Sequence, residues 1–126
     1  MNFKKGVLAA FVALIVGVSA LYAQNHADLR SGVYRPVPVA QGKAMVLIQN
    51  TNLRTVKNVI VIRPDGSVHA QGTARINGTR VNVDYGDDGF ETWTIVDQEE
   101  FNTDDGLTTL RKVRDLNNNE RNLFRN

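Results

Sequence analysis

Short extended runs separated by turn-forming residues are the feature that most constrains the fold of this chain. The turn signals are Pro64-Asp65-Gly66, Asn77-Gly78, Gly86-Asp87-Asp88-Gly89 and Asp104-Asp105-Gly106. Glycine adopts positive φ without strain and aspartate bonds its own backbone, so each segment can reverse the chain. Asn-Gly between two extended runs is also a strong hairpin signal. The spacing of these turns therefore predicts a series of consecutive antiparallel strands.

The runs between the turns have the periodicity of β-strands. Residues 67–76 and 80–85 alternate apolar and polar side chains, as expected for strands with one buried face. Residues 57–63 contain a continuous β-branched apolar run, which predicts a strand that is buried on both faces or central in its sheet. Further strands are expected at residues 31–37, 43–50, 90–96, 99–101 and 107–113.

We therefore predict an all-β domain, an antiparallel meander of seven or eight strands that forms a small barrel or sandwich, with a short C-terminal tail. Pro36 and Pro38 cannot donate ladder hydrogen bonds, so the first strand is expected to fray or lie at an edge there. Gly72 and Ala74 lie in mid-strand, where small residues allow a sharp bend or the close approach of another element. They would also leave room for a ligand.

The N-terminus has the order of residues of a bacterial secretory signal peptide. Lys4 and Lys5 precede the apolar run 7–18, and small residues follow. This pattern predicts cleavage after Ala23, with cleavage after Ala20 or a retained membrane anchor as alternatives. The mature protein is expected to be periplasmic or secreted and to meet the membrane only through this segment.

The expected organisation of the chain follows from the signal segment and the strands. Residues 1–23 are the expected signal peptide, 24–30 a flexible lead, 31–115 the β-barrel domain and 116–126 a polar tail. The tail could form one turn of helix or be disordered.

Composition excludes several classes of function. The chain has no cysteine, which excludes disulfides, thiol nucleophiles and thiolate metal sites. Removal of the two signal-segment lysines leaves 13 basic and 13 acidic residues, a balance that does not support nucleic-acid binding. The charges are segregated, because residues 24–82 hold eight basic and two acidic residues whereas residues 83–110 hold nine acidic and no basic ones. Neutralisation between neighbouring strands is expected, with a surface for a charged partner as the alternative.

Three features resemble small bacterial lipocalin-like (calycin-type) exported β-barrel domains. Gly32-Val33-Tyr34 lies in the first strand, where lipocalins have glycine, any residue and tryptophan. A meander with an aspartate–glycine turn and a glycine-bearing strand follows. The closing-strand resemblance is carried by Trp93-Thr94-Ile95-Val96-Asp97, Phe101, Gly106 and Leu110-Arg111-Lys112. The resemblance implies that Tyr34 closes the barrel floor and that Arg111 stacks over its ring.

The motifs for catalysis and metal binding are incomplete. An EF-hand calcium loop within residues 84–95 would lack ligand oxygens at its third and twelfth positions, so a turn is predicted, with a looser oxygen site as the alternative. Ser67, His69 and Asp65 form a nominal catalytic set in a tight turn, where such sets arise by chance. A mature N-terminus at residues 24–26 could bind Cu²⁺ or Ni²⁺. Weighing these motifs, we predict no catalytic residue, no metal site and no cofactor.

The sequence thus favours an exported, non-enzymatic binding module of lipocalin-like type. Tyr34, Tyr85 and Trp93 are expected to face inward and to contact a small apolar ligand. The alternative is a protein-interaction or structural module with a filled core, whose partner would be another exported protein. Neither prediction involves nucleic acid.

Overall fold

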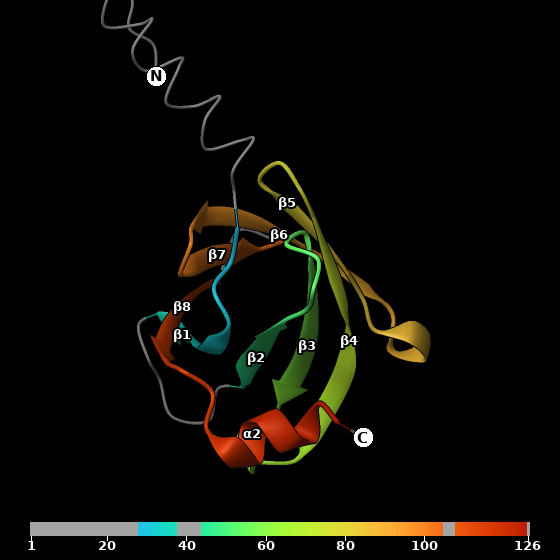
Figure 1. Ribbon diagram of the computed structural model, residues 1–126, viewed down its shortest axis with the longest axis vertical. Helices are drawn as coiled ribbons and strands as arrows, with labels where there is room; N and C mark the ends of the chain where they lie inside the picture. The colour runs from blue at the N-terminus through green and yellow to red at the C-terminus, as the bar shows by residue number, and fades with distance from the viewer. Residues whose placement is uncertain (1–27, 38–43, 105–107, 126) are drawn as a thin grey trace, which may run out of the picture.

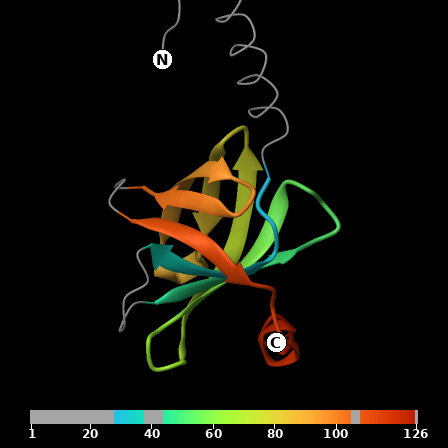
Figure 2. The same cartoon turned by 90° about the vertical axis from the view of Figure 1, so that its left-hand side faces the viewer.

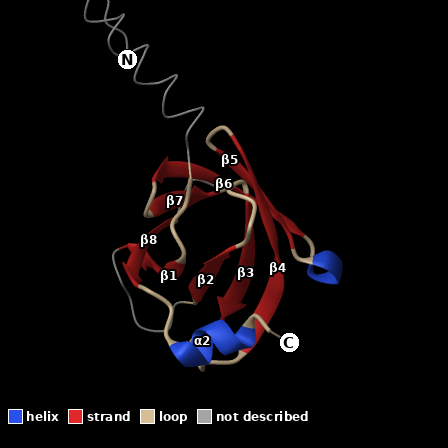
Figure 3. Ribbon diagram, in the orientation of Figure 1, coloured by secondary structure: helices blue, strands red, loops and turns tan. Residues whose placement is uncertain are grey.

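The computed structural model describes residues 28–37, 44–104 and 108–125. In this part of the chain eight strands form in order, each antiparallel to the next, and the first pairs with the last (Figure 1). The strands are β1 (Gly32–Val37), β2 (Met45–Asn50), β3 (Val56–Ile62), β4 (Val68–Asn77), β5 (Arg80–Asp84), β6 (Phe90–Asp97), β7 (Glu100–Thr103) and β8 (Thr109–Arg114). The 3₁₀ helix η1 (Gly86–Asp88) and the α-helix α2 (Asn118–Leu123) are drawn in blue in Figure 3. The predicted all-β meander is confirmed, and it closes as a barrel.

The hairpin order defines two ends of the barrel. The mouth is the end at which β1, β3, β5 and β7 finish, and the floor is the opposite end, at which β2, β4, β6 and β8 finish. Because every hairpin returns the chain to the same two ends, residues distant in sequence meet around one rim.

β1 explains why proline is tolerated in a closed barrel. This strand pairs with β2 only from Gly32 to Tyr34, whereas its pairing with β8 continues to Val37. Pro36 lies opposite Leu110 on β8, beyond the end of the β2 pairing. The predicted edge at Pro36 is therefore present on the side of β1 that faces β2. On the side that faces β8 the prediction is wrong, because the pairing that closes the barrel continues past Pro36. Pro38 lies outside the described residues.

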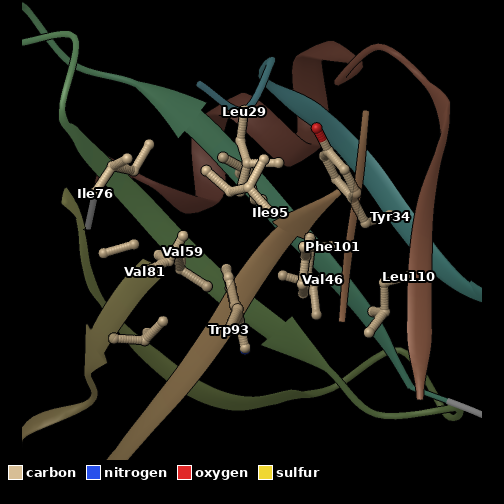
Figure 4. Packing of buried hydrophobic residues seen from close by; sticks show 13 residues of the cluster. Leu29, Tyr34, Val46, Val59, Ile76, Val81, Trp93, Ile95, Phe101 and Leu110 are labelled. Carbon is tan, nitrogen blue, oxygen red and sulfur yellow. The ribbon is translucent and has the colours of Figure 1, made fainter. Parts of the chain in front are cut away.

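One hydrophobic cluster with members from all eight strands fills the barrel interior (Figure 4). Its buried members are Leu29, Tyr34, Val46, Ile48, Val59, Ala74, Ile76, Val81, Val83, Trp93, Ile95, Phe101 and Leu110. Each large apolar side chain buried in this way contributes about 1.5–3 kcal/mol to folding. The alternation read from the sequence therefore identifies the side of each strand that faces the core.

A second hydrophobic cluster lies between α2 and the outer faces of β1, β2 and β3. It contains Val33, Leu47, Ile60, Ile62 and Leu116, with Met45, Leu123 and Phe124 packed against it. Figure 2 shows α2 outside the ring of strands. This packing buries the second face of β3 and confirms the prediction of a strand covered on both sides.

Local hydrogen bonds explain why the C-terminal tail is helical. The Asn117 side chain accepts from the backbone N–H of Glu120, and the Glu120 carboxylate accepts from the backbone N–H of Asn117. This capping box satisfies donors that a helix start otherwise leaves open. Arg114 donates two 2.7 Å hydrogen bonds to the same carboxylate. Of the two alternatives for the tail, the helix is the one observed. In the described residues, no helix is long and apolar enough to cross a membrane.

The close approach of β5 accounts for Gly72. A Cβ atom at this position would lie 2.1 Å from the carbonyl oxygen of Asp84, which is far inside van der Waals contact. Ala74, two residues further along, is buried in the interior cluster. The small residues of β4 are therefore explained by close packing.

Residues 28–30 help to close the barrel floor. Leu29 is 1% exposed and belongs to the interior cluster. The Asp28 carboxylate pairs at 3.0 Å with the buried Lys57 ammonium, which also donates to the Asn50 side chain. The folded unit therefore includes residues that the sequence division assigned to a flexible lead. The signal segment and the rest of the lead, residues 1–27, lie outside the described residues.

Candidate functional site: a cavity at the barrel mouth

A cavity of about 250 Å³ opens at the mouth. Its described lining comes from six strands and from residues beside them: Pro36, Ala44, Val46, Val61, Glu91, Trp93, Phe101, Thr103, Thr108 and Leu110. Most of these side chains are apolar, as is usual for small-molecule sites. The volume is below the usual 300–1,000 Å³ of drug-sized sites, but it exceeds the roughly 150 Å³ of a cavity known to bind benzene. It therefore suits a ligand of about one ring with a short substituent.

A series of three aromatic rings separates the cavity from the floor. The rings of Trp93 and Phe101 are stacked, with centroids 4.1 Å apart and an interplanar angle of 22°. Phe101 in turn meets Tyr34, at 5.4 Å and 44°. Trp93 and Phe101 line the cavity, whereas Tyr34 does not. The barrel is thus filled towards the floor and hollow at the mouth. Figure 4 shows the three rings among the side chains of the interior cluster.

Tyr34 lies at the floor, away from the cavity that Trp93 lines. Its hydroxyl donates to the carbonyl oxygens of Arg30 at 2.6 Å and Gln98 at 3.2 Å. Burial, with the nearby carboxylate charges, raises the pKa of Tyr34 above its ordinary range, so this hydroxyl stays protonated and able to donate. The floor position agrees with the role that the lipocalin-like resemblance implies for this residue.

The stacking of Arg111 over Tyr34 that the resemblance implies is wrong. Leu110 occupies the inward position on β8, so the next residue, Arg111, points outward and is paired with Glu100 on β7. A second pair joins Arg30 to Glu99 at 3.0 Å. These two pairs confirm charge neutralisation between neighbouring segments, although exposed pairs contribute only about 0–1 kcal/mol each.

Tyr85 and Glu91 form the polar side of the mouth. Tyr85 packs against the interior cluster, and its hydroxyl donates to Oε1 of Glu91 at 2.9 Å. Burial, followed by the Glu91 charge, raises the pKa of Tyr85 above its ordinary range. Glu91 lines the cavity beside Trp93. In the sequence analysis Glu91 belongs only to the alternative oxygen site within residues 84–95, although its spacing of two residues from Trp93 on β6 would have placed it on the inner face.

The acidic segment between β5 and β6 forms a turn, as predicted. Tyr85 N–H donates to the carbonyl of Gly89 at 2.8 Å, and an Asp84 carboxylate oxygen accepts from Gly86 N–H at 2.8 Å. Asp87 and Asp88 are exposed beside the mouth. Across the described residues, no group of three or more His, Asp or Glu side chains is arranged to hold a metal ion.

The nominal catalytic set lies in the β3–β4 turn. Ser67 donates to the Asp65 carboxylate at 2.6 Å, and its backbone N–H donates to the same oxygen at 2.9 Å. These bonds have the pattern of an Asx turn, in which the carboxylate organises the backbone. His69 is exposed on β4. Residues 24–26, considered above as an alternative copper or nickel site, lie outside the described residues.

A second hollow of about 250 Å³ lies on the outside of the barrel, lined by Asn58, Gln71, Thr73, Val59, Gly72 and Phe124. Its side chains are mostly polar. The mouth cavity is therefore the better match to an apolar ligand.

No protein-family model, curated protein or solved structure matches this chain at a significant level. The structure itself defines a small, closed, antiparallel β-barrel with a hollow at one end. This architecture is compatible with a lipocalin-like barrel.

Proposed function

We propose that the protein is an exported, non-enzymatic binding module of lipocalin-like type, which holds a small, mainly apolar ligand in the mouth cavity. The observation that carries this proposal is the apolar hollow above Trp93 and Phe101 in an otherwise filled barrel. Eight-stranded barrels are just wide enough to be filled by side chains or to hold one small ligand. Here the side chains fill only the floor part.

The export element of the proposal rests on the N-terminal sequence, with its lysines followed by an apolar run and small residues. The structure adds one supporting relationship. Asp28, the first described residue, pairs with Lys57 near the floor. The described chain therefore begins near the floor, at the end opposite the cavity.

A protein-interaction module is the second candidate, and exposed apolar residues at the mouth favour it. Phe90 is 81% exposed, and Val37 and Val68 at the same end are also exposed. An exposed apolar group beside a barrel mouth could contact another exported protein. A pull-down from the periplasmic fraction, with Phe90→Ser as the control bait, would test this candidate.

The fluorescence of Trp93 tests the binding proposal. Trp93 is the only tryptophan in the chain, so its emission reports on the cavity wall alone. Titration of the mature protein with phenethyl alcohol should change the emission saturably. Val61→Phe fills the cavity and should abolish the change, whereas Val96→Phe, at a position 51% exposed, should retain it. Absence of a saturable change, or an equal response of both variants, would overturn the proposal.

A further inference from the structure

We propose that the mouth cavity selects a ligand in which a positively charged amino group is joined to a small apolar body, and that Glu91 binds the amino group. This inference rests on the proposed binding function and names its ligand class. It follows from the chemistry of the cavity wall and of the mouth around it.

Glu91 is the only charged residue in the described lining of the cavity. It lies two residues from Trp93 on β6, so both side chains are on the inner face of the strand. Among the described residues, the Glu91 side chain has one hydrogen-bond partner, Tyr85, and no ion-pair partner. A half-buried carboxylate without a counter-charge is unfavourable, and a bound cation offsets that cost.

The Tyr85 hydroxyl positions the carboxylate for such a ligand. This hydroxyl donates a 2.9 Å hydrogen bond to Oε1 of Glu91. A carboxylate has about four lone-pair sites, so roughly three remain for the donors of an ammonium group. Because Tyr85 is packed against the interior cluster, it holds Glu91 in one orientation before the ligand arrives. This reduces the entropy lost on binding.

The remainder of the wall suits the apolar body of the ligand. Trp93, Val61 and Leu110 present carbon surfaces to the same hollow as Glu91. The ring of Trp93 is stacked on Phe101 and is 1% exposed, so its position is fixed. A ligand ring can therefore lie against Trp93 while its amino group reaches Glu91.

The charges around the mouth favour entry of a cation. Asp84, Asp87, Asp88 and Asp104 are exposed at strand ends on this side of the barrel. The β3–β4 turn adds Arg63 and Asp65, whose opposite charges offset each other. Clefts bordered by charge of one sign raise the local concentration of oppositely charged ligands. The same field disfavours an apolar carboxylate such as a short fatty acid.

Three probes of nearly equal size and different charge test the inference: phenethylamine, phenethyl alcohol and phenylacetate. Their affinities are measured at pH 7 by calorimetry and by Trp93 emission. We expect the amine to bind about tenfold more tightly than the alcohol and phenylacetate to bind most weakly. Glu91→Gln should bring the amine to the affinity of the alcohol. Glu99→Gln, in an exposed pair near the floor, should preserve the ranking.

The outcomes separate this inference from the function on which it rests. If the alcohol binds the wild-type protein as tightly as the amine does, or if Glu91→Gln keeps the preference, the inference is wrong and the binding function stands. If none of the probes binds, the proposed function itself fails. If Glu91→Gln does not fold, Glu91→Asp is the substitute variant, because it keeps the carboxylate but moves it back from the cavity by the length of one methylene. It should reduce the preference for the amine, and an unchanged preference would contradict the role of Glu91.

Discussion

The ring centroids of Trp93 and Phe101 lie 4.1 Å apart, and this stacked pair marks the boundary between the filled and the hollow part of the barrel. On the floor side Phe101 meets Tyr34, and on the mouth side both Trp93 and Phe101 border the cavity. One aromatic pair thus contributes to the core and also forms the wall of the site. Stability and binding can therefore be separated by substitutions on either side of this pair.

Phe101→Ala should lower the free energy of unfolding by about 3–5 kcal/mol, because it removes a fully buried ring and leaves a void that the barrel cannot close. Urea unfolding followed by circular dichroism measures this loss. Phe90→Ala is the matched control, since Phe90 is exposed on the next strand, and it should change stability by less than about 0.5 kcal/mol. Similar losses in the two variants would contradict the assigned core.

Tyr34→Phe should cost about 1–2 kcal/mol of stability, because the carbonyl of Arg30 loses its 2.6 Å hydrogen bond near the floor. The affinity for phenethyl alcohol should stay within about twofold of the wild-type value, since Tyr34 is not in the cavity wall. Unfolding and fluorescence titrations measure the two quantities. Loss of affinity with unchanged stability would instead support the ligand contact predicted for Tyr34 from sequence.

Gly72→Ala should destabilise the protein by about 1–3 kcal/mol, because the new methyl group would overlap the carbonyl oxygen of Asp84 and force β5 away. Thermal unfolding measures the effect. Gln71→Ala, at the exposed neighbouring position, should have an effect below about 0.5 kcal/mol. A Gly72→Ala variant as stable as the wild type would show that β5 does not approach β4 so closely.

The contribution of Glu120 to stability should depend on pH. Its hydrogen bonds with Arg114 lower the pKa of Glu120 below the ordinary value of 4.5 in the folded chain. The contribution should therefore be complete above about pH 4.5 and should disappear as the pH falls through the lower folded value. At pH 7, Glu120→Gln should cost about 1–3 kcal/mol.

Unfolding of wild type and Glu120→Gln between pH 7 and pH 3 checks this dependence. The difference between the two proteins should shrink across the acidic limb. Glu99→Gln is the control, because both members of its pair with Arg30 are exposed, and its cost should be about 0–1 kcal/mol. A difference for Glu120→Gln that stays constant down to pH 3 would show that its carboxylate does not hold α2 in place.

The strands were predictable because their signals are local. Asn77-Gly78 and the alternation in β4 and β5 can be read from adjacent residues, and both are present in the structure. The choice between barrel and sandwich depended on the pairing of β1 with β8. These strands are far apart in sequence, so no local pattern decides whether they meet. The sequence left the tail open between a helical turn and disorder, whereas the structure shows a capping box between Asn117 and Glu120 and the packing of Leu116, Leu123 and Phe124 against the outer faces of β1, β2 and β3.

The site was predictable only in part. Alternation placed Trp93 inside the barrel, which the structure bears out. Alternation shows which face of a strand is inward but not how far along the barrel axis a residue lies. Tyr34 and Trp93 were therefore both expected to contact the ligand, although Tyr34 lies towards the floor and Trp93 borders the mouth cavity. Glu91 was not identified as a wall residue because it was grouped with its acidic neighbours, for which a turn was predicted with an oxygen site as the alternative. Its inward position follows from the register of β6 with Trp93.

The most direct test of the binding site is methyl nuclear magnetic resonance of the mature protein during titration with phenethyl alcohol. The account predicts saturable shifts of the Val46, Val61 and Leu110 methyl signals, which border the cavity. The methyl signals of Val33, Leu47 and Ile60, which belong to the second hydrophobic cluster beneath α2, should not move. Chemical-shift changes confined to this second cluster, or no saturable change at any methyl group, would contradict the account.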